Sequence, residues 1–256
     1  MNLLSANQNS KSFPIIGVEI HATSYEDACD RILSLAQSKT SCYIVAANVH
    51  VVMTAFWDRT YREVVNRAIL VTPDGMPLVW GLRLLGVRNQ PRVYGPDLML
   101  AWCDRAAKEG LSVYLYGSKT ETLEKLERNL KVQFPQLAIA GSYAPPYQKD
   151  VEVLESELTL IKESGAAVVF VALGCPKQEF WMAQVQGKLD AVMVGVGAAF
   201  DFHSGQVSQA PRWIMRLGLE WLYRFAQEPQ RLWRRYLLNN PLFVILFAWQ
   251  LLRGKH

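Results

Sequence analysis

Short apolar runs alternate with amphipathic stretches along most of the chain. The runs that we interpret as strands lie at residues 15–20, 42–47, 69–72, 112–116, 137–141, 167–173 and 190–196. Helical patterns separate them, including one that begins at Ser24 and the charged stretches 121–133 and 151–164. Near-continuous apolar strands separated by helices predict an α/β, Rossmann-like fold, with a mostly parallel sheet of about six strands covered on both faces.

Ligands of such a sheet bind beyond the carboxyl ends of its strands. The segments that follow the predicted strands are rich in polar residues or glycine: 48–50, 72–75, 117–119, 174–179 and 195–201. Because parallel strands end at the same edge of the sheet, we expect these segments to meet there and to form one ligand-binding site.

Charge divides the chain into two parts. The whole chain has 27 Lys+Arg and 23 Asp+Glu, a net charge of +4, which alone does not indicate a nucleic-acid-binding protein. Residues 211–256 carry a balance of +6 and four of the eight Trp, whereas residues 1–210 carry −2. We therefore predict a catalytic α/β domain at 1–210 and a basic, aromatic, helical appendage at 211–256, here called the tail.

The tail has the pattern of a helix at a membrane interface. The apolar residues Trp213, Ile214, Leu217, Trp221, Leu222 and Phe225 fall on one helical face. Arg212, Arg216 and Arg224 follow a neighbouring stripe, and an apolar run continues from Pro241 to Trp249. Basic and aromatic residues in this arrangement favour an interfacial helix, and the alternative is a helix pair packed on the body. The apolar run is too short to span a membrane.

The cysteines and the N-terminal sequence indicate the cellular compartment of the protein. The polar sequence of residues 1–13 has no apolar core, so we expect no secretory signal. Four Cys without a CxxC spacing give neither a disulfide framework nor a zinc ribbon. We expect a cytoplasmic protein that is peripheral on the inner face of the cell membrane, and an undocked tail would favour self-association.

Two loops carry candidate chemistry, each with a simpler alternative. Asp74, between Pro73 and Gly75, can act as a general base towards a hydroxyl, although Asp-Gly is also a common turn pair. The glycines Gly195 and Gly197 resemble the start of a dinucleotide fingerprint, but the third glycine is absent and we interpret the segment up to Gly205 as a loop. A nicotinamide-dependent oxidoreductase therefore remains the alternative function.

The sequence gives weaker signals for a phosphate-binding site and for a metal site. Gly117-Ser118 can place a helix N-terminus against a phosphate, or can be a simple turn. His50 and His203 are candidates for catalysis, but they lack metal-ligand spacing, and we interpret them in preference as structural histidines with satisfied hydrogen bonds. No Asp-x-Asp occurs, so an enzyme of sugar nucleotides here would use cationic side chains or helix termini in place of a metal ion.

Several segments together resemble the WecG/TagA/CpsF family of bacterial glycosyltransferases. The resemblance covers nearly the whole chain, in order, at residues 46–55, 71–80, 92–99, 113–118, 171–181, 194–214 and 220–237. It implies an inverting, metal-independent transfer of a hexose, of the N-acetylmannosamine type or related, from a UDP-sugar. The implied acceptor is a sugar on a polyprenyl diphosphate, the implied pathway is cell-surface polysaccharide synthesis, and no cofactor is implied.

The resemblance also implies roles for individual residues. Asp74 matches the family's proposed base, and the matching substrate-binding positions are Asn48, Arg92, Gln178, Gly195, Gly197 and Asp201. Arg92 and the tail arginines Arg212, Arg216 and Arg224 are the candidates to neutralise a diphosphate. The family often has Thr two residues before the Asn, where this chain has Ala46. A non-catalytic peripheral membrane protein is the third class that the sequence leaves open.

Overall fold

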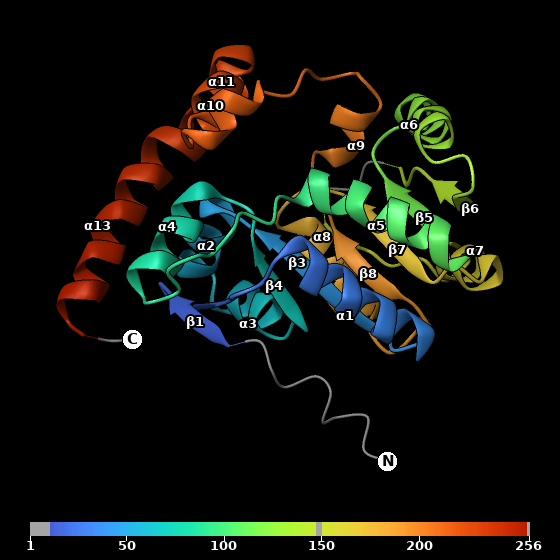
Figure 1. Cartoon of the computed structure of the whole chain (residues 1–256), viewed down its shortest axis with the longest axis horizontal. Helices are drawn as coiled ribbons and strands as arrows, with labels where there is room; N and C mark the ends of the chain where they lie inside the picture. The colour runs from blue at the N-terminus through green and yellow to red at the C-terminus, as the bar shows by residue number, and fades with distance from the viewer. Residues whose placement is uncertain (1–10, 147–149, 255–256) are drawn as a thin grey trace.

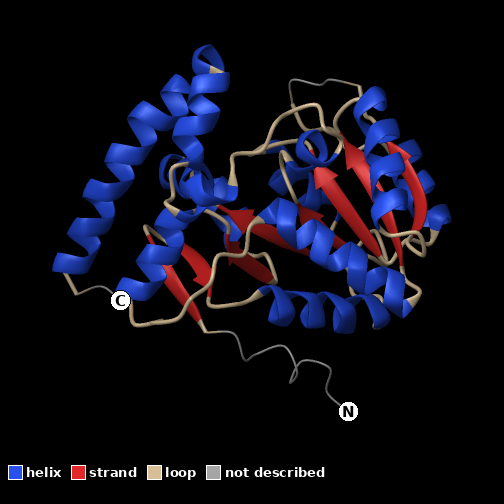
Figure 2. Cartoon of the chain, turned by 45° about the horizontal axis from the view of Figure 1, so that its top comes forward, coloured by secondary structure: helices blue, strands red, loops and turns tan. Residues whose placement is uncertain are grey.

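The computed structural model describes residues 11–146 and 150–254. Its centre is a parallel six-stranded sheet in the order β4-β3-β8-β7-β5-β6, with helices on both sides (Figure 2). The strands are β3 (Cys42–Ala47), β4 (Leu70–Pro73), β5 (Ser112–Gly117), β6 (Ala138–Tyr143), β7 (Val168–Ala172) and β8 (Val192–Gly195). The predicted α/β fold is therefore confirmed, with both ends of every strand of this sheet within two residues of the predicted position.

Both faces of the sheet are covered because its strands are apolar on both sides. In β3, Tyr43 and Val45 join one core and Cys42 and Ile44 join the other, as the two-residue period of a strand requires. Helices on the first face are α2 (Val49–Trp57), α3 (Arg59–Asn66), α4 (Met76–Leu84), α7 (Glu155–Ser164) and α8 (Lys177–Val185). Helices on the second face are α1 (Tyr25–Gln37), α5 (Gly95–Glu109), α6 (Thr120–Gln133) and α9 (Ala199–His203).

Two local predictions were wrong. The run at residues 15–20 is not a strand of the main sheet: it turns at Ile16 and Gly17, both with positive φ, to form the antiparallel hairpin β1 (Ser12–Ile15) and β2 (Val18–His21). The segment after Gly197 is not all loop, since α9 begins at Ala199. Its five residues bury Ala199 and Phe200 in the second core, and that burial stabilises a helix too short to show a period in the sequence.

The tail is broken into short helices. They are α10 (Arg212–Arg216), α11 (Glu220–Gln227), α12 (Pro229–Trp233), the π-helical turn η1 (Arg234–Leu238) and α13 (Asn239–Leu252). The break between α10 and α11 lies at Gly218, whose φ of +72° is left-handed and where an added Cβ would lie 2.7 Å from the Trp80 ring of α4. The prediction of one continuous helical face across Trp213 and Phe225 was therefore wrong.

The last helix lies against the α/β body. In Figure 1, α13 runs beside α4 and α2, on the side away from α6. Phe243 and Phe247 are buried in the first core, and the Gln250 side chain accepts from the Ile16 N–H (2.8 Å) and donates to the Pro14 carbonyl (2.6 Å). The opposite side of α13 stays exposed. Among the described residues, no helix has the length and apolarity needed to span a bilayer.

Candidate active site

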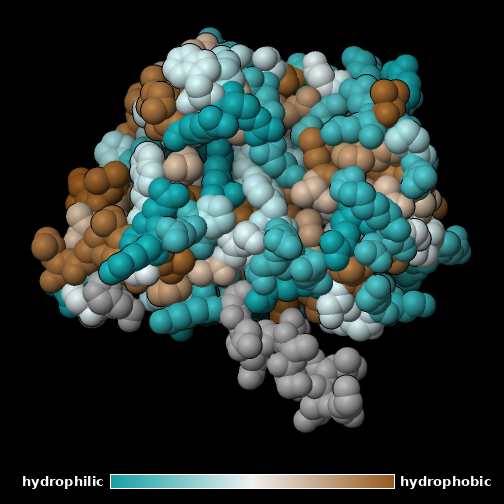
Figure 3. Space-filling view, viewed as in Figure 1, coloured by the Kyte–Doolittle hydropathy of each residue, from teal (hydrophilic) through white to brown (hydrophobic). Residues whose placement is uncertain are grey.

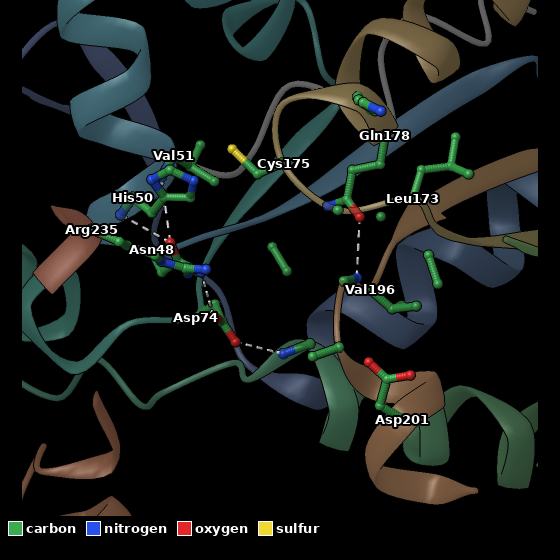
Figure 4. A pocket seen from close by; sticks show the side chains of 18 of the residues that line it. Asn48, His50, Val51, Asp74, Leu173, Cys175, Gln178, Val196, Asp201 and Arg235 are labelled. Atoms are coloured by element: carbon green, nitrogen blue, oxygen red, sulfur yellow. Dashed lines mark hydrogen bonds between the residues drawn. The ribbon is translucent and has the colours of Figure 1, made fainter. Parts of the chain in front are cut away.

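A cavity of about 1250 Å³ lies beyond the carboxyl ends of the strands. The segments that follow β3, β4, β5, β7 and β8 line it, and α11, α12 and η1 of the tail line it as well. Figure 4 shows how their side chains converge. The cavity brings together most of the predicted site residues: Asn48, Asp74, Arg92, Gln178, Gly195, Gly197, Asp201 and Arg224.

Asp74 is a buried carboxyl group at the edge of this cavity. Its side chain is directed by two donors, the Gly95 N–H to Oδ1 (2.8 Å) and the Asn48 amide to Oδ2 (3.4 Å), both visible in Figure 4. Burial raises the pKa of Asp74 to about 6, although Arg92 and the two hydrogen bonds act in the opposite direction. A carboxyl with this pKa is ionised at neutral pH and can still accept a proton from a bound hydroxyl.

Asn48 links the start of α2, the helix that follows β3, to Asp74. Its side-chain oxygen accepts from the N–H groups of His50 (3.0 Å) and Val51 (3.3 Å), which makes it the N-cap of α2. Because the oxygen is committed to the helix, the amide nitrogen is left to face Asp74. The cap thus determines which end of the amide meets the carboxylate.

Arg92 lies on the other side of Asp74. Its Nε donates to the Asp74 backbone carbonyl, and its guanidinium lies 4.1 Å from the centre of the Tyr94 ring. Its Nη2 forms an ion pair with Glu220 of the tail (2.6 Å). Arg92 is therefore fixed by contacts from both the body and the tail.

Gln178 occupies the start of α8 with its amide oriented by two neighbours. Its oxygen accepts from the Gly197 N–H (3.2 Å) and its nitrogen donates to Glu179 (2.7 Å). Glu179 has no exposed surface, and burial raises the pKa of its carboxyl. The requirement for glycine at position 195 is steric, because a Cβ there would lie 2.9 Å from Met182 and 3.0 Å from Gln178.

Asp201 and Ser118 mark the opposite part of the cavity from Asp74 along the sheet edge. Asp201 lies on α9, and the Ser118 hydroxyl approaches it at 3.5 Å. Burial raises the pKa of Asp201, while Arg231 and Arg224 of the tail lower it. The glycine-containing segment at 195–197 lies between these residues and Gln178 and lines the cavity.

The three predicted tail arginines occupy different places. Arg224 lines the cavity, and its Nε is buried without a hydrogen-bond partner in the described part of the chain. Arg212 is exposed and paired with Asp97 of α5, while Arg216 is exposed on α10; neither is among the residues that line the cavity. The structure therefore groups only Arg224 of the three with Asp74.

Sequence reasoning missed several cavity residues from the tail and favoured a structural role for His50 of α2. Arg231, Arg234 and Arg235 all line the cavity, and the Arg235 side chain is half-buried with its Nε unpartnered in the described structure. Burial and the proximity of Arg235 lower the pKa of His50 to about 4, and its Nδ1 is buried with no partner among the described residues. The interpretation of His50 as a satisfied structural histidine was therefore wrong, whereas His203 does bond the Pro96 carbonyl (2.9 Å).

Most of the basic residues that line the cavity are arginines. Within residues 11–146 and 150–254, no three His, Cys, Asp or Glu side chains gather in a group that could hold a metal ion. Guanidinium groups bind phosphate oxygens in a bidentate manner. The cavity thus combines two carboxyls of raised pKa, Asp74 and Asp201, with several cations, a set suited to proton removal beside a phosphate-bearing substrate.

Comparison with known proteins agrees with this chemistry. The family model described as "Glycosyl transferase WecG/TagA/CpsF family" matches residues 13–256. A relative from Bacillus spizizenii, named N-acetylglucosaminyldiphosphoundecaprenol N-acetyl-beta-D-mannosaminyltransferase, is 36% identical over 211 residues, which cover 82% of this chain and 79% of the relative. A protein of the same name from Bacillus subtilis is 32% identical over 229 residues, covering 89% and 86%.

Proposed function

The chain belongs to the WecG/TagA/CpsF family of glycosyltransferases, and from this premise we propose that it transfers N-acetylmannosamine or a related hexose from a UDP-sugar to N-acetylglucosaminyl-diphosphoundecaprenol. The acceptor and the sugar are those in the names of the two relatives. We propose further that the transfer inverts the anomeric carbon and needs no metal ion. The family match favours this reaction over the nicotinamide-dependent oxidoreductase.

The observation that carries the proposal is the buried carboxyl of Asp74 beside a cluster of cations in one cavity. In the proposed step, Asp74 takes the proton of the acceptor hydroxyl while the oxygen of that hydroxyl forms a bond to the anomeric carbon of the donor sugar. The bond from that carbon to the UDP oxygen breaks, and UDP leaves with the electron pair. Attack from the face opposite the leaving group inverts the configuration.

Stabilising the leaving diphosphate is the second requirement. Arg92 and Arg224 both line the cavity and present guanidinium groups that can meet the negative charge that develops on UDP. We propose that the glycine-containing segment at 195–197, together with Gln178 and Asp201, holds the nucleotide part of the donor. Arg212 and Arg216 lie outside the cavity lining, so we assign to them a role at the membrane surface.

We propose that the tail at 211–256 is a membrane-association unit on the catalytic domain at 1–210. The outward side of α13 exposes Val244, Ile245, Trp249 and Leu252, and Figure 3 shows hydrophobic surface on the side of the molecule where α13 lies. Arg253 lies 3.5 Å from the centre of the Trp249 ring. Apolar side chains flanked by cations suit the inner face of an anionic membrane, where a lipid-linked acceptor resides.

The experiment that tests this function measures sugar transfer to a polyprenyl-diphosphate-linked N-acetylglucosamine. Donors to compare are UDP-N-acetylmannosamine, its uronate, UDP-glucose and UDP-galactose, with UDP release and the glycolipid product both followed. We expect transfer from one of these donors without added metal ion and in the presence of EDTA. Absence of transfer from every UDP-sugar would contradict the proposed donor class.

A further inference from the structure

Glu220, at the start of α11, reaches from the tail to the segment of the body that holds Asp74. Its Oε2 pairs with Nη2 of Arg92 (2.6 Å), and its Oε1 accepts from the Tyr94 hydroxyl (2.7 Å). The Arg92 and Glu220 side chains are only 17% and 14% exposed, so this pair is largely shielded from water. A shielded, doubly hydrogen-bonded carboxylate constrains its partners far more than an exposed ion pair does.

The partners of Glu220 belong to a short stretch that contacts Asp74 at several atoms. Arg92 donates through Nε to the Asp74 carbonyl, and the Gly95 N–H donates to Asp74 Oδ1 (2.8 Å). Between them, the Val93 N–H donates to the carbonyl of Pro73, the residue before Asp74 (3.1 Å). The stretch 92–95 therefore determines where the Asp74 carboxyl lies.

The orientation of Arg92 is also fixed by this arrangement. Nε is held by the body, Nη2 is held by Glu220, and the guanidinium lies over the Tyr94 ring. Tyr94 is itself held by Glu220 through its hydroxyl. One carboxylate thus orients both residues that flank the catalytic carboxyl, while Arg92 keeps its place in the cavity lining.

We propose that Glu220 is a positioning residue for the transfer reaction, which fixes Arg92 and Tyr94 so that the stretch 92–95 holds Asp74 in its working geometry. The proposal rests on the proposed role of Asp74 as the base. Glu220 has no direct contact with Asp74, and it acts through the two side chains that it binds. Because Glu220 lies on α11, docking of the tail and the geometry of the base are coupled.

The charges around Asp74 give this role a second consequence. The ionisable groups that act on the Asp74 carboxyl are Arg92, Arg235, Glu220, Tyr25 and Tyr94. Glu220 raises the pKa of Asp74, whereas Arg92 lowers it. Replacing Glu220 by Gln removes the negative charge and leaves Arg92 without its counter-ion, and both changes lower the pKa of Asp74.

The test compares Glu220→Gln, Glu220→Ala and Tyr94→Phe with the wild type, using the full-length protein and the donor that supports transfer. For Glu220→Gln we expect kcat to fall by about tenfold and the acid limb of the pH–rate profile to move to lower pH. Tyr94→Phe, which removes one of the two contacts, should give a smaller fall. Glu63→Gln is the matched control, because Glu63 is an exposed partner of Arg59 on α3, and it should leave both quantities unchanged.

Amide hydrogen exchange provides a readout that does not depend on turnover. Glu220→Ala should speed the exchange of the Val93 and Gly95 N–H groups, which bond Pro73 and Asp74.

A higher kcat or tighter donor binding in Glu220→Gln would show that Glu220 competes with substrate for Arg92, and would overturn the proposal. Unchanged kcat, pH profile and exchange would overturn it as well. If Asp74→Asn kept full turnover, the base role would fail, while the exchange result would still test whether Glu220 holds the stretch.

Discussion

At the scale of the single residue, Glu179 and Asp74 are both buried carboxyl groups, but they differ in their partners and in their access to the cavity. Glu179 lies wholly inside the protein and bonds Gln178, so it orients an amide. Asp74 lies at the cavity edge between Arg92 and Asn48, and its pKa is about 6. This difference in access explains why Asp74, and not Glu179, is suited to take a proton from a substrate.

The raised pKa of Asp74 predicts a pH-dependent effect on stability. The pKa rises from 3.8 to about 6 on folding, so the native state binds the proton more tightly than the unfolded chain. The wild type therefore loses about 3 kcal/mol of unfolding free energy as the pH rises through this range. Asp74→Asn lacks this loss, so we expect it to be more stable than the wild type at pH 8 and to lose the advantage by pH 4.

Urea unfolding of both proteins at a series of pH values checks this prediction. Asp190→Asn, at an exposed aspartate before β8 and outside the cavity lining, is the charge-matched control and should show no such pH-dependent gain. A stability difference for Asp74→Asn that did not change between pH 4 and pH 8 would contradict the account of its burial.

Most of the body residues that line the cavity were accessible from the sequence, whereas Arg224 was the one tail residue of the lining that was predicted. Asn48, Asp74 and Gln178 follow recognisable strands, so the rule that ligands bind at strand ends identified their segments. Glu220 and Arg235 depend on the path of the tail across the body. That path is determined by the turn at Gly218 against Trp80, a tertiary contact that no local pattern encodes.

At the scale of the element, N-cap side chains account for where α1 and α2 begin. Ser24 caps α1 by accepting from the Asp27 N–H, as its position before an apolar period predicts, and Asn48 caps α2 in the same way. The hairpin at Ile16-Gly17 was missed because an apolar run of six residues does not by itself reveal a turn. Helix α9 was missed because five residues are too few to show a helical period.

The two caps allow stability and function to be separated. Asn48→Ala and Ser24→Ala each remove an N-cap, so each should lower the free energy of unfolding by about 1 kcal/mol. Only Asn48 also contacts Asp74, so only Asn48→Ala should lower kcat. Urea unfolding and transfer assays on the two variants check this. Equal losses of activity in both would mean that the loss at Asn48 is a stability effect alone.

At the scale of the whole molecule, a near-neutral body contacts a basic tail. Some helices of the tail line the cavity, and the last one packs against the body. Arg224, Arg231 and Arg235 line the cavity, while α13 packs Phe243 and Phe247 against the body. The apolar side chains left outside on α13 explain the membrane-interface pattern of the sequence. The sequence therefore predicted apolar side chains on the outer surface of the tail, although the division of the tail into several helices was not predictable from a single amphipathic stripe.

Replacing the exposed apolar face of α13 should separate membrane binding from catalysis. In the triple variant Val244→Ser, Ile245→Ser, Trp249→Ser, the buried Phe243 and Phe247 remain, so the fold should persist. We expect several-fold weaker binding to anionic vesicles and slower transfer to a vesicle-embedded acceptor, with unchanged transfer to a short-chain, water-soluble acceptor.

The control for this surface is Leu160→Ser on α7, an exposed apolar residue on a helix outside the tail. It should leave vesicle sedimentation and both transfer rates unchanged. Wild-type vesicle binding by the triple variant would exclude α13 as the membrane-binding surface.

The most direct test of the account is the rate of sugar transfer by Asp74→Asn beside its affinity for UDP, measured at pH 7.5 with Asp190→Asn as control. Asn preserves the size of the side chain and can still accept from the Gly95 N–H, but it cannot take the proton of the acceptor hydroxyl. We predict that kcat falls by at least about 100-fold while the Kd for UDP changes little. Transfer by Asp74→Asn at the wild-type rate would contradict the central claim that this carboxyl is the base.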